Sequence, residues 1–324
     1  MNRLEQIKVI REILSNAGFY VSDLYSMRPI GFDLIARRDN SLLIIKVLTN
    51  INALSEEVAN EIKLLSKLLK GHPLLIGERG GNTFLEKDVV YDRFGIQTIS
   101  LDTLESYLLD GTPLKVYAAP GGFYVNLDNE KLIMLRKKKN ISIGTFARSV
   151  KVSRRTVRMY EEGMNARVEF AQRIEDLLND TITIDIDLLN INQKQKIYEK
   201  TKKTIQNKPE EKYQDLQKEI FSILKQVGYE IIPMDRCPFD AVSKDKDKVL
   251  LTCVHKNDKQ LIRRAQIVGS ISKITEKHAV LFTEGKIKKY NIEGTPLIVK
   301  KELKKLRGPE EIIELIIERM TYNN

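Results

Sequence analysis

The sequence predicts a chain of several domains in the α+β or α/β class, with a small all-helical domain between two α/β units. Its 324 residues are enough for two or three domains that each bury a core of their own. Helical and strand-like segments occur in the same order before and after the middle of the chain. Between them, residues 141–163 have the pattern of two short helices joined by a tight turn. These three observations define the expected fold class.

The first α/β unit is expected over residues 1–112. An amphipathic helix stops at Ala17-Gly18, and Arg38-Asp39-Asn40 has the composition of a turn between two strands. The expected elements are helices over 4–16 and 55–69 and from Asp102, and strands at 19–21, 31–36, 41–47, 73–77 and 96–100. This order of elements predicts an α/β unit.

The second α/β unit, expected over residues 213–324, repeats the order of the first. Its opening helix ends at Val227-Gly228-Tyr229, as the first helix of the chain ends at Ala17-Gly18-Phe19. The later matches pair 239–242 with 32–35, 249–254 with 42–47, and 278–284 with 72–78. Four correspondences in the same order indicate an internal duplication.

The central domain is expected over residues 113–190. Two strands over 115–127 are joined by Pro120-Gly121-Gly122, and a short alternating strand falls at 181–187. The helices that should enclose the central pair lie at 128–139 and 166–178. The lysine-rich segment 191–212 has almost no large apolar residues, so we expect an exposed helix or flexible linker there.

The central pair of helices is specified by its caps and its apolar stripe. Ser142 and Ser153 stand where each helix would begin, and Gly163 stands where the second would end. Apolar residues recur at three- and four-residue spacing, namely Ile143, Phe146, Ala147, Val150, Val157 and Tyr160. Because Ala147 is small, the two helices can cross closely there. The pattern predicts a helix-turn-helix.

Basic and hydroxyl side chains are expected to face outward from this motif. Arg154, Arg155, Thr156 and Arg158 lie at the start of the second helix, the end that enters the major groove of DNA. The preceding helix and residues 136–139 would then contact the DNA backbone and fix the position of the motif on the duplex. The complete predicted DNA-binding set is Arg136, Lys137, Lys138, Lys139, Ser142, Thr145, Arg148, Ser153, Arg154, Arg155, Thr156 and Arg158. The competing interpretation is a helical hairpin with a solvated arginine face.

The positive charge of the chain is concentrated in the same region. The formal net charge is +10 and the sequence pI is about 9.3. Residues 129–179 contain twelve Lys or Arg against six Asp or Glu, so this stretch carries +6 of the +10. A local excess of this kind indicates a polyanionic partner.

The same sequence excludes several other classes of protein. Two cysteines and three scattered histidines do not make a disulfide scaffold or a zinc site, and we expect no metal and no cofactor. No run approaches 18 apolar residues, and the N-terminus does not resemble a signal peptide. We therefore expect a cytoplasmic protein that does not contact a membrane.

Residues 141–163 resemble the helix-turn-helix of the Cro and phage-repressor class. The likeness includes the closing Tyr160-Glu161-Glu162-Gly163. Lys151 departs from the class, which usually has glycine there for a left-handed turn. A lysine in that conformation costs about 1 kcal/mol.

The repeated α/β unit resembles the PD-(D/E)xK nuclease fold, and most nearly the junction-resolving nucleases of archaea. The resemblance implies a metal site in which Asp33 matches the conserved Asp and Lys46 matches the Lys. The position of the second acid is Ile44, and an alkyl side chain cannot ligate Mg²⁺. The other interpretation is that Asp33 is a hydrogen-bonded residue at a strand edge and Lys46 a surface lysine.

The second copy of this unit departs further from the nuclease pattern. Asp240 is present, but the following strand offers Thr252, Cys253 and Val254 instead of an acid and a lysine. Catalysis would need a carboxylate from elsewhere, such as Glu5, Glu12 or Glu61 in the first copy. We therefore expect no catalytic residues and no enzyme, with the scaffold kept for DNA contact or self-association.

The whole chain resembles a family of archaeal helix-turn-helix transcriptional regulators. The likeness is best from Val116 to Leu189 and includes residues 117–124 just before the opening helix. It implies a regulator that binds double-stranded DNA. Our first hypothesis is a sequence-specific regulator that binds as a homodimer, because one helix-turn-helix covers only half a turn of DNA. The alternatives are a metal-dependent DNA nuclease or repair factor, and an architectural nucleic-acid-binding protein.

Overall fold

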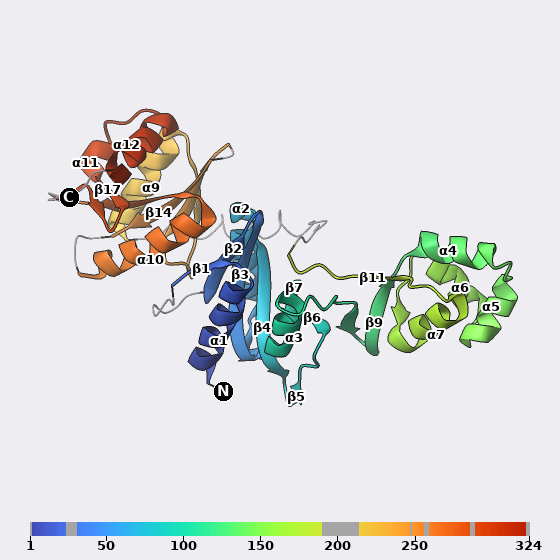
Figure 1. Ribbon diagram of the computed structural model, residues 1–324. Helices are drawn as coiled ribbons and strands as arrows, with labels where there is room; N and C mark the ends of the chain where they lie inside the picture. The colour runs from blue at the N-terminus through green and yellow to red at the C-terminus, as the bar shows by residue number, and fades with distance from the viewer. Residues whose placement is uncertain are drawn as a thin grey trace. The chain divides into compact units, whose positions relative to one another are not determined.

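The computed structural model describes residues 2–23, 31–189, 214–246, 248–255, 259–285 and 289–321. The predicted linker at 191–212 lies outside the described residues. The chain divides into two compact units. The first comprises Met1–Gln6, Leu48–Ala53 and Leu74–Leu188, and the second Ile7–Val47, Leu54–Pro73 and Leu189–Asn324 (Figure 1).

The N-terminal part of the second unit contains a three-stranded antiparallel arrangement. Strand β2 pairs with β1 on one side and with β3 on the other. The elements are α1 (Arg3–Asn16), β1 (Tyr20–Val21), β2 (Leu34–Arg38), β3 (Ser41–Asn50) and α2 (Glu56–Leu69). Asp39, in the turn between β2 and β3, has a φ of 50°, as a tight hairpin requires. The predicted pair of strands at 31–36 and 41–47 is therefore a hairpin.

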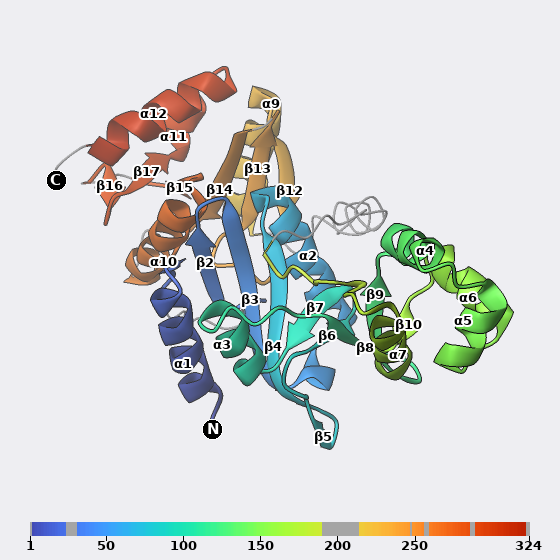
Figure 2. The same cartoon turned by 45° about the vertical axis from the view of Figure 1, so that its right-hand side comes forward.

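The rest of the second unit is a complete mixed sheet with helices beside it (Figure 2). The strand order is β12-β13-β14-β15-β17-β16, antiparallel through β14 and parallel from β14 through β15 to β17. Its strands are β12 (Glu230–Pro233), β13 (Ala241–Asp245), β14 (Lys248–Val254), β15 (His278–Thr283), β16 (Asn291–Ile292) and β17 (Thr295–Val299). Its helices are α9 (Asp215–Val227), α10 (Lys259–Thr275), α11 (Lys300–Leu303) and α12 (Pro309–Thr321). Apolar residues of α9, α12 and the strands form one core.

Part of the first unit has the same strand pairing as the C-terminal sheet. Strand β7 runs parallel to β4 and antiparallel to β6, just as β17 runs parallel to β15 and antiparallel to β16. The elements are η1 (Ile51–Ala53), β4 (His72–Gly80), β5 (Thr83–Phe84), β6 (Val89–Arg93), β7 (Ile96–Ile99) and α3 (Leu101–Leu108). Strands β5 and β6 were not predicted, because β5 has only two residues and β6 contains the charged Asp92 and Arg93. The shared order and pairing agree with an internal duplication.

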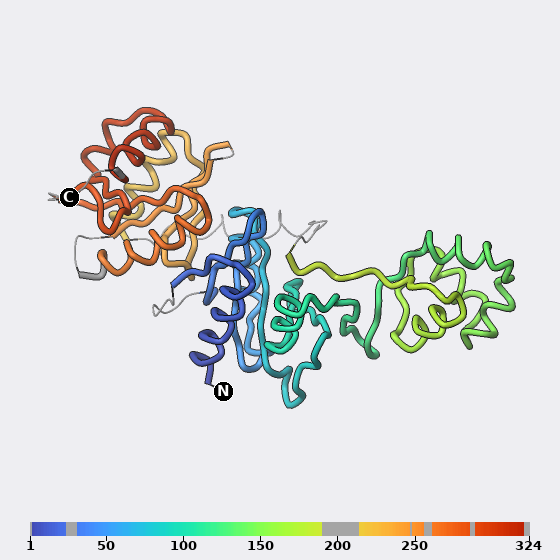
Figure 3. Tube along the Cα trace, viewed as in Figure 1, coloured from blue at the N-terminus to red at the C-terminus, as the bar shows by residue number. Residues whose placement is uncertain are grey.

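The remainder of the first unit contains the predicted helical domain (Figure 3, green and yellow-green). Strand β9 lies between β8 and β10 and also pairs with β11, and β8 runs parallel to β6. The elements are β8 (Val116–Ala119), β9 (Gly122–Leu127), α4 (Asn129–Lys138), α5 (Ile143–Val150), α6 (Arg154–Glu161), β10 (Ala166–Arg167), α7 (Val168–Leu178) and β11 (Thr183–Ile184). The strand predicted over 181–187 is only β11 and an isolated bridge from Ile186 to Leu114. The predicted fold class, a helical domain between two nuclease-like α/β units, is confirmed.

Candidate nucleic-acid interface

Helices α5 and α6 begin at the serines that the sequence predicts. The Oγ of Ser142 accepts a hydrogen bond from the backbone N–H of Thr145, with Oγ and N 3.1 Å apart. The Oγ of Ser153 accepts in the same way from Thr156, at 3.0 Å. A cap of this kind stabilises a helix start by about 1 kcal/mol. Both helices therefore begin at the residues that the motif requires.

The turn between α5 and α6 is left-handed even though it lacks glycine. Lys151 has φ 61° and ψ 45°. The backbone N–H of the next residue, Val152, donates to the carbonyl of Ala147 over 3.0 Å, which closes α5 as in a Schellman motif. The lysine thus adopts the conformation that glycine usually supplies at this place.

The inner faces of the two helices are buried together. Phe146, Val150 and Val157 are fully buried, and Ala147 and Tyr160 are 3% exposed. They pack in one cluster with Val125 and Leu127 of β9 and with residues of α4 and α7. This confirms the predicted apolar stripe and fixes which side of each helix faces outward.

The outward side carries exposed cations. The exposed basic side chains are Arg148, Lys151, Arg154, Arg155 and Arg158. Within the described residues, none of them forms a hydrogen bond or an ion pair through its side chain. Their charge is therefore not neutralised by the protein, which is what an anion-binding surface needs. Met159, which shares this face four residues after Arg155, is 39% exposed and was not predicted.

Arg154 differs from the other two arginines of α6 in its surroundings. A Cβ atom placed on Gly144 of α5 would lie 3.2 Å from both Nε and Nη2 of Arg154. The guanidinium therefore lies against the glycine, and a larger residue at 144 would displace it. Arg155 and Arg158 have no such contact, and their spacing of three residues places them on one face of α6.

Two of the four basic residues at 136–139 have contacts inside the domain. Arg136 is 9% exposed, its Nε lies 2.5 Å from Oε1 of Glu161, and its Nη1 donates to the carbonyl of Ile141 over 3.0 Å. The Nζ of Lys139 donates to the carbonyl of Leu177 over 3.2 Å. Because Arg136 joins α4 to the end of α6, it is positioned as a structural residue. Lys137 and Lys138 are exposed.

Hydroxyl groups in the predicted set also have local partners. The Oγ of Ser142 donates to Oγ1 of Thr145 over 3.0 Å, and the hydroxyls of Ser153 and Thr156 lie 2.8 Å apart. These groups hold the helix starts in shape and remain at the surface, except that Thr156 is half-buried. Because a hydroxyl oxygen has two lone pairs, these groups can contact DNA while they keep their capping bonds.

The nuclease-like centre of the N-terminal repeat has an Asp–Lys pair, with Ile44 at the position of the second acid. The Oδ2 of Asp33 accepts from the backbone N–H of Val47 over 2.7 Å and lies 3.6 Å from Nζ of Lys46. The side chains are 9% exposed for Asp33 and 11% for Lys46. Lys46 is therefore not the surface lysine of our alternative interpretation. Ile44 is fully buried at the position of the missing acid.

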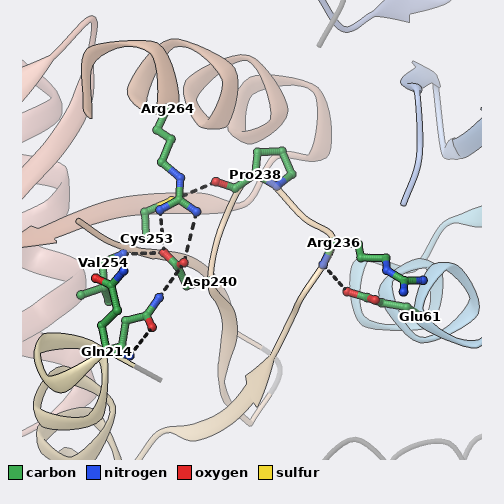
Figure 4. A network of polar contacts seen from close by, with 9 residues as sticks. Glu61, Gln214, Arg236, Pro238, Asp240, Cys253, Val254 and Arg264 are labelled. Carbon is green, nitrogen blue, oxygen red and sulfur yellow. Dashed lines mark hydrogen bonds and ion pairs between the residues drawn. The ribbon is translucent and has the colours of Figure 1, made fainter. Parts of the chain in front are cut away.

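The C-terminal repeat places its aspartate in the same backbone geometry (Figure 4). The Oδ2 of Asp240 accepts from the N–H of Val254 over 2.7 Å, matching Asp33 and Val47. Arg264 of α10 contacts both carboxylate oxygens, at 3.3 and 3.1 Å, and Nε2 of Gln217 donates to Oδ1 over 2.9 Å. Burial works to lower the pKa of Arg264, but the charges of Asp240 and Cys253 and the hydrogen bond to Asp240 together outweigh it, so that pKa is raised. The carboxylate is thus neutralised by an arginine.

The strand register identifies the residues that replace the other two nuclease positions in this repeat. Ala241 pairs with Thr252 as Leu34 pairs with Ile45. The residue matching Ile44 is therefore Leu251, in agreement with the sequence match of 249–254 to 42–47. Cys253 takes the place of Lys46, and burial raises the pKa of its thiol above the ordinary range.

The described residues contain no group of three or more His, Cys, Asp or Glu side chains that could hold a metal ion. Glu61, a candidate for a recruited acid, accepts from the backbone N–H of Arg236 over 2.8 Å (Figure 4). Glu5, another candidate, is exposed and accepts from the backbone N–H of Asn2 over 2.9 Å. Two-metal hydrolysis needs several carboxylates around the ions, and neither centre supplies them.

Two protein-family models match separate segments of the chain. Residues 3–114 match the model of a PD-(D/E)XK superfamily domain, and residues 132–183 match a helix-turn-helix model. The chain is 37% identical over 98% of its length, and 98% of the relative's, to a "Putative HTH-type transcriptional regulatory protein" of Methanosarcina acetivorans. A relative of the same name from Archaeoglobus fulgidus is 36% identical over 97% of each chain. The chain belongs to this archaeal family.

Other comparisons agree with this assignment. A third relative of the same name, from Methanosphaerula palustris, is 38% identical and covers 94% of the chain and 95% of its own length. No solved structure matches the chain. Among the described helices of this family member, none is long and apolar enough to cross a membrane. The family models confirm both resemblances, to the Cro-type helix-turn-helix and to the nuclease fold.

Proposed function

We propose that the chain is a sequence-specific transcriptional regulator that reads double-stranded DNA with α6 in the major groove. The observation that carries this proposal is the pair Arg155 and Arg158, exposed and unpaired within the described residues on a helix whose other face is fixed in the core. The names of the relatives support the regulatory part of this proposal.

The chemistry of recognition follows from the side chains on this face. A guanidinium fork matches the O6 and N7 acceptors of guanine, and each good bidentate contact gives about 1–3 kcal/mol of discrimination. Arg155 and Arg158 are our candidates for this contact, with Thr156 beside them and Arg154 held against Gly144. The residues that would contact the DNA backbone are Ser142, Thr145, Arg148, Ser153, Lys137 and Lys138.

A base-reading role for Arg155 can be separated from a general loss of charge. We expect Arg155→Ala to weaken binding to a preferred duplex, obtained by selection from random sequence, more than binding to an unrelated duplex. Each lost base contact removes about 1–3 kcal/mol from the preferred site only. Fluorescence anisotropy at one fixed salt concentration measures both affinities.

The matched control is Arg79→Ala, which removes one exposed arginine from β4, outside the helical domain. This variant should leave both affinities unchanged. An equal loss for both duplexes in Arg155→Ala would mean that Arg155 contacts the DNA backbone only. A wild-type protein that binds all duplexes alike would favour the architectural alternative.

We also propose that the chain binds as a homodimer on a two-fold site. One helix-turn-helix contacts about half a helical turn, and such proteins commonly pair their motifs about 34 Å apart. Analytical ultracentrifugation of the protein on the selected duplex gives the number of chains bound. A single chain per duplex, with undiminished sequence preference, would contradict the dimer.

A further inference from the structure

The sheet beside the helix-turn-helix has an outward face that the proposed function does not yet use. Tyr117 of β8, Tyr124 of β9 and Arg167 of β10 lie opposite one another across the three strands. Their neighbours Val125 and Ala166 point into the core. Because side chains alternate along a strand, these three residues lie on the opposite, solvent-facing side. We refer to them as the tyrosine–arginine row.

The side chains of the row are held in place by one another. The rings of Tyr117 and Tyr124 stack, with centroids 6.0 Å apart and planes 28° apart. The guanidinium of Arg167 lies over the Tyr124 ring, 6.0 Å from its centroid. Asn165 donates its Nδ2 proton to the hydroxyl of Tyr117 over 2.7 Å. An arginine oriented in this way loses little conformational entropy on binding an anion.

The tyrosine–arginine row lies next to the tight turn between β8 and β9, and the backbone of this turn is exposed to solvent. Pro120 and Gly121 occupy the central positions of the β8–β9 turn, and Gly121 and Gly122 have φ values of 94° and 137°. A Cβ on Gly121 would lie 3.3 Å from Nη2 of Arg167 and from the hydroxyl of Tyr124, and a Cβ on Gly122 would meet nothing within 4 Å. The guanidinium therefore reaches toward an exposed glycine turn.

Arg167 is an exposed cation without a carboxylate partner in the described part of the chain. Its pKa is raised first by a hydrogen bond to Tyr124, and only to a smaller extent by the charge of Glu169. It also follows α6 closely, since β10 begins after the short turn at Gly163. The eight residues of α6 are about 12 Å long, which is about the width of the major groove. A segment attached to the end of α6 therefore lies at the edge of that groove, where the phosphates are.

We propose that the tyrosine–arginine row and the Pro120–Gly121 turn form a second DNA contact, which binds a phosphate at the edge of the groove that α6 enters. This contact rests on the proposed function of α6, because it uses the same duplex. It adds affinity without sequence preference, since a phosphate is the same at every base pair.

The experiment compares Arg167→Ala and Arg167→Lys with wild type on the preferred and on an unrelated duplex. Loss of one phosphate contact makes the slope of log K against log salt shallower by about 0.9. Between about 50 and 200 mM salt, Arg167→Ala should therefore lose about 3.5-fold less affinity than wild type. Both duplexes should be weakened by the same factor, and Arg167→Lys should restore the salt slope because it keeps the charge.

Three results would overturn this contact. One is an unchanged affinity and salt slope in Arg167→Ala, while Arg155→Ala still weakens the preferred site; the proposed function of α6 would then stand alone. Another is a selective loss at the preferred site, which would make Arg167 a base-reading residue. The third is binding of a single-stranded oligonucleotide that Tyr124→Ala abolishes while duplex binding is unchanged, which would make the row a base-stacking surface. If the proposed function of α6 is wrong, the wild-type protein will show no sequence preference, and this result differs from all three.

Discussion

At the scale of single residues, Asp33 and Asp240 differ in the cation that lies beside the carboxylate. Both carboxylates accept a backbone N–H from the neighbouring strand, at 2.7 Å in each case. Asp33 has Lys46 beside it, and Asp240 has the fork of Arg264. A buried carboxylate needs a nearby positive charge, and in the C-terminal repeat an arginine from the chain provides it.

Removing this arginine should expose the cost of the buried acid. We expect Arg264→Met to lower the free energy of unfolding of the C-terminal repeat by about 3 kcal/mol, because Asp240 is left charged and unpaired. The double variant Arg264→Met with Asp240→Asn should recover much of that loss. Hydrogen exchange of peptides from β13 and β14 measures both.

The control for this prediction is Lys273→Met, which changes an exposed cation on the same helix. It should leave exchange in β13 and β14 unchanged. If Arg264→Met loses less than about 1 kcal/mol, the carboxylate is hydrated and the pair is worth no more than a surface salt bridge.

At the scale of elements, the turn between α5 and α6 is left-handed although a lysine and not a glycine occupies it. Lys151 holds a φ of 61°, a conformation that costs a side-chain-bearing residue about 1 kcal/mol more than glycine. The caps at Ser142 and Ser153 and the buried stripe are strong enough to hold it there.

Glycine at this position should therefore stabilise the motif. We expect Lys151→Gly to slow hydrogen exchange across residues 141–163, by the equivalent of up to about 1 kcal/mol. Lys151→Ala is the matched variant, because it removes the charge and keeps the Cβ. Equal protection in the two variants would mean that relief of charge repulsion, and not backbone strain, is responsible.

At the scale of the whole molecule, the sequence predicts where helices begin and end, but it does not predict which side chains from different elements contact one another. The limits of α4, α5 and α6 follow from capping residues and apolar spacing that lie within a few residues of one another. The partner of Asp240 could not be predicted, because Arg264 comes from a different element and is brought to it only by the fold. The same holds for Arg136, whose partner Glu161 is on another helix.

The nuclease-like repeats lead to a prediction for the intact chain. We expect no cleavage of linear, branched or nicked DNA in Mg²⁺ or Mn²⁺, because Ile44 and Leu251 stand where a metal-binding acid is required. Purified wild type is compared with the Asp33→Ala, Lys46→Ala double variant on labelled substrates. Cleavage by wild type that disappears in the double variant would restore the nuclease hypothesis, and cleavage by both would point to a contaminant.

The hydrogen bond from a strand amide to Asp33 or Asp240 gives each carboxylate a structural task of its own. An aspartate that accepts the N–H of Val47 or Val254 helps to close the strand pair whether or not a metal is bound. Ile44 and Leu251, at the position of the second acid, are fully buried and belong to the core. An aspartate at this strand is therefore poor evidence of nuclease activity by itself, because its bond to the neighbouring strand is a sufficient reason for it to be there.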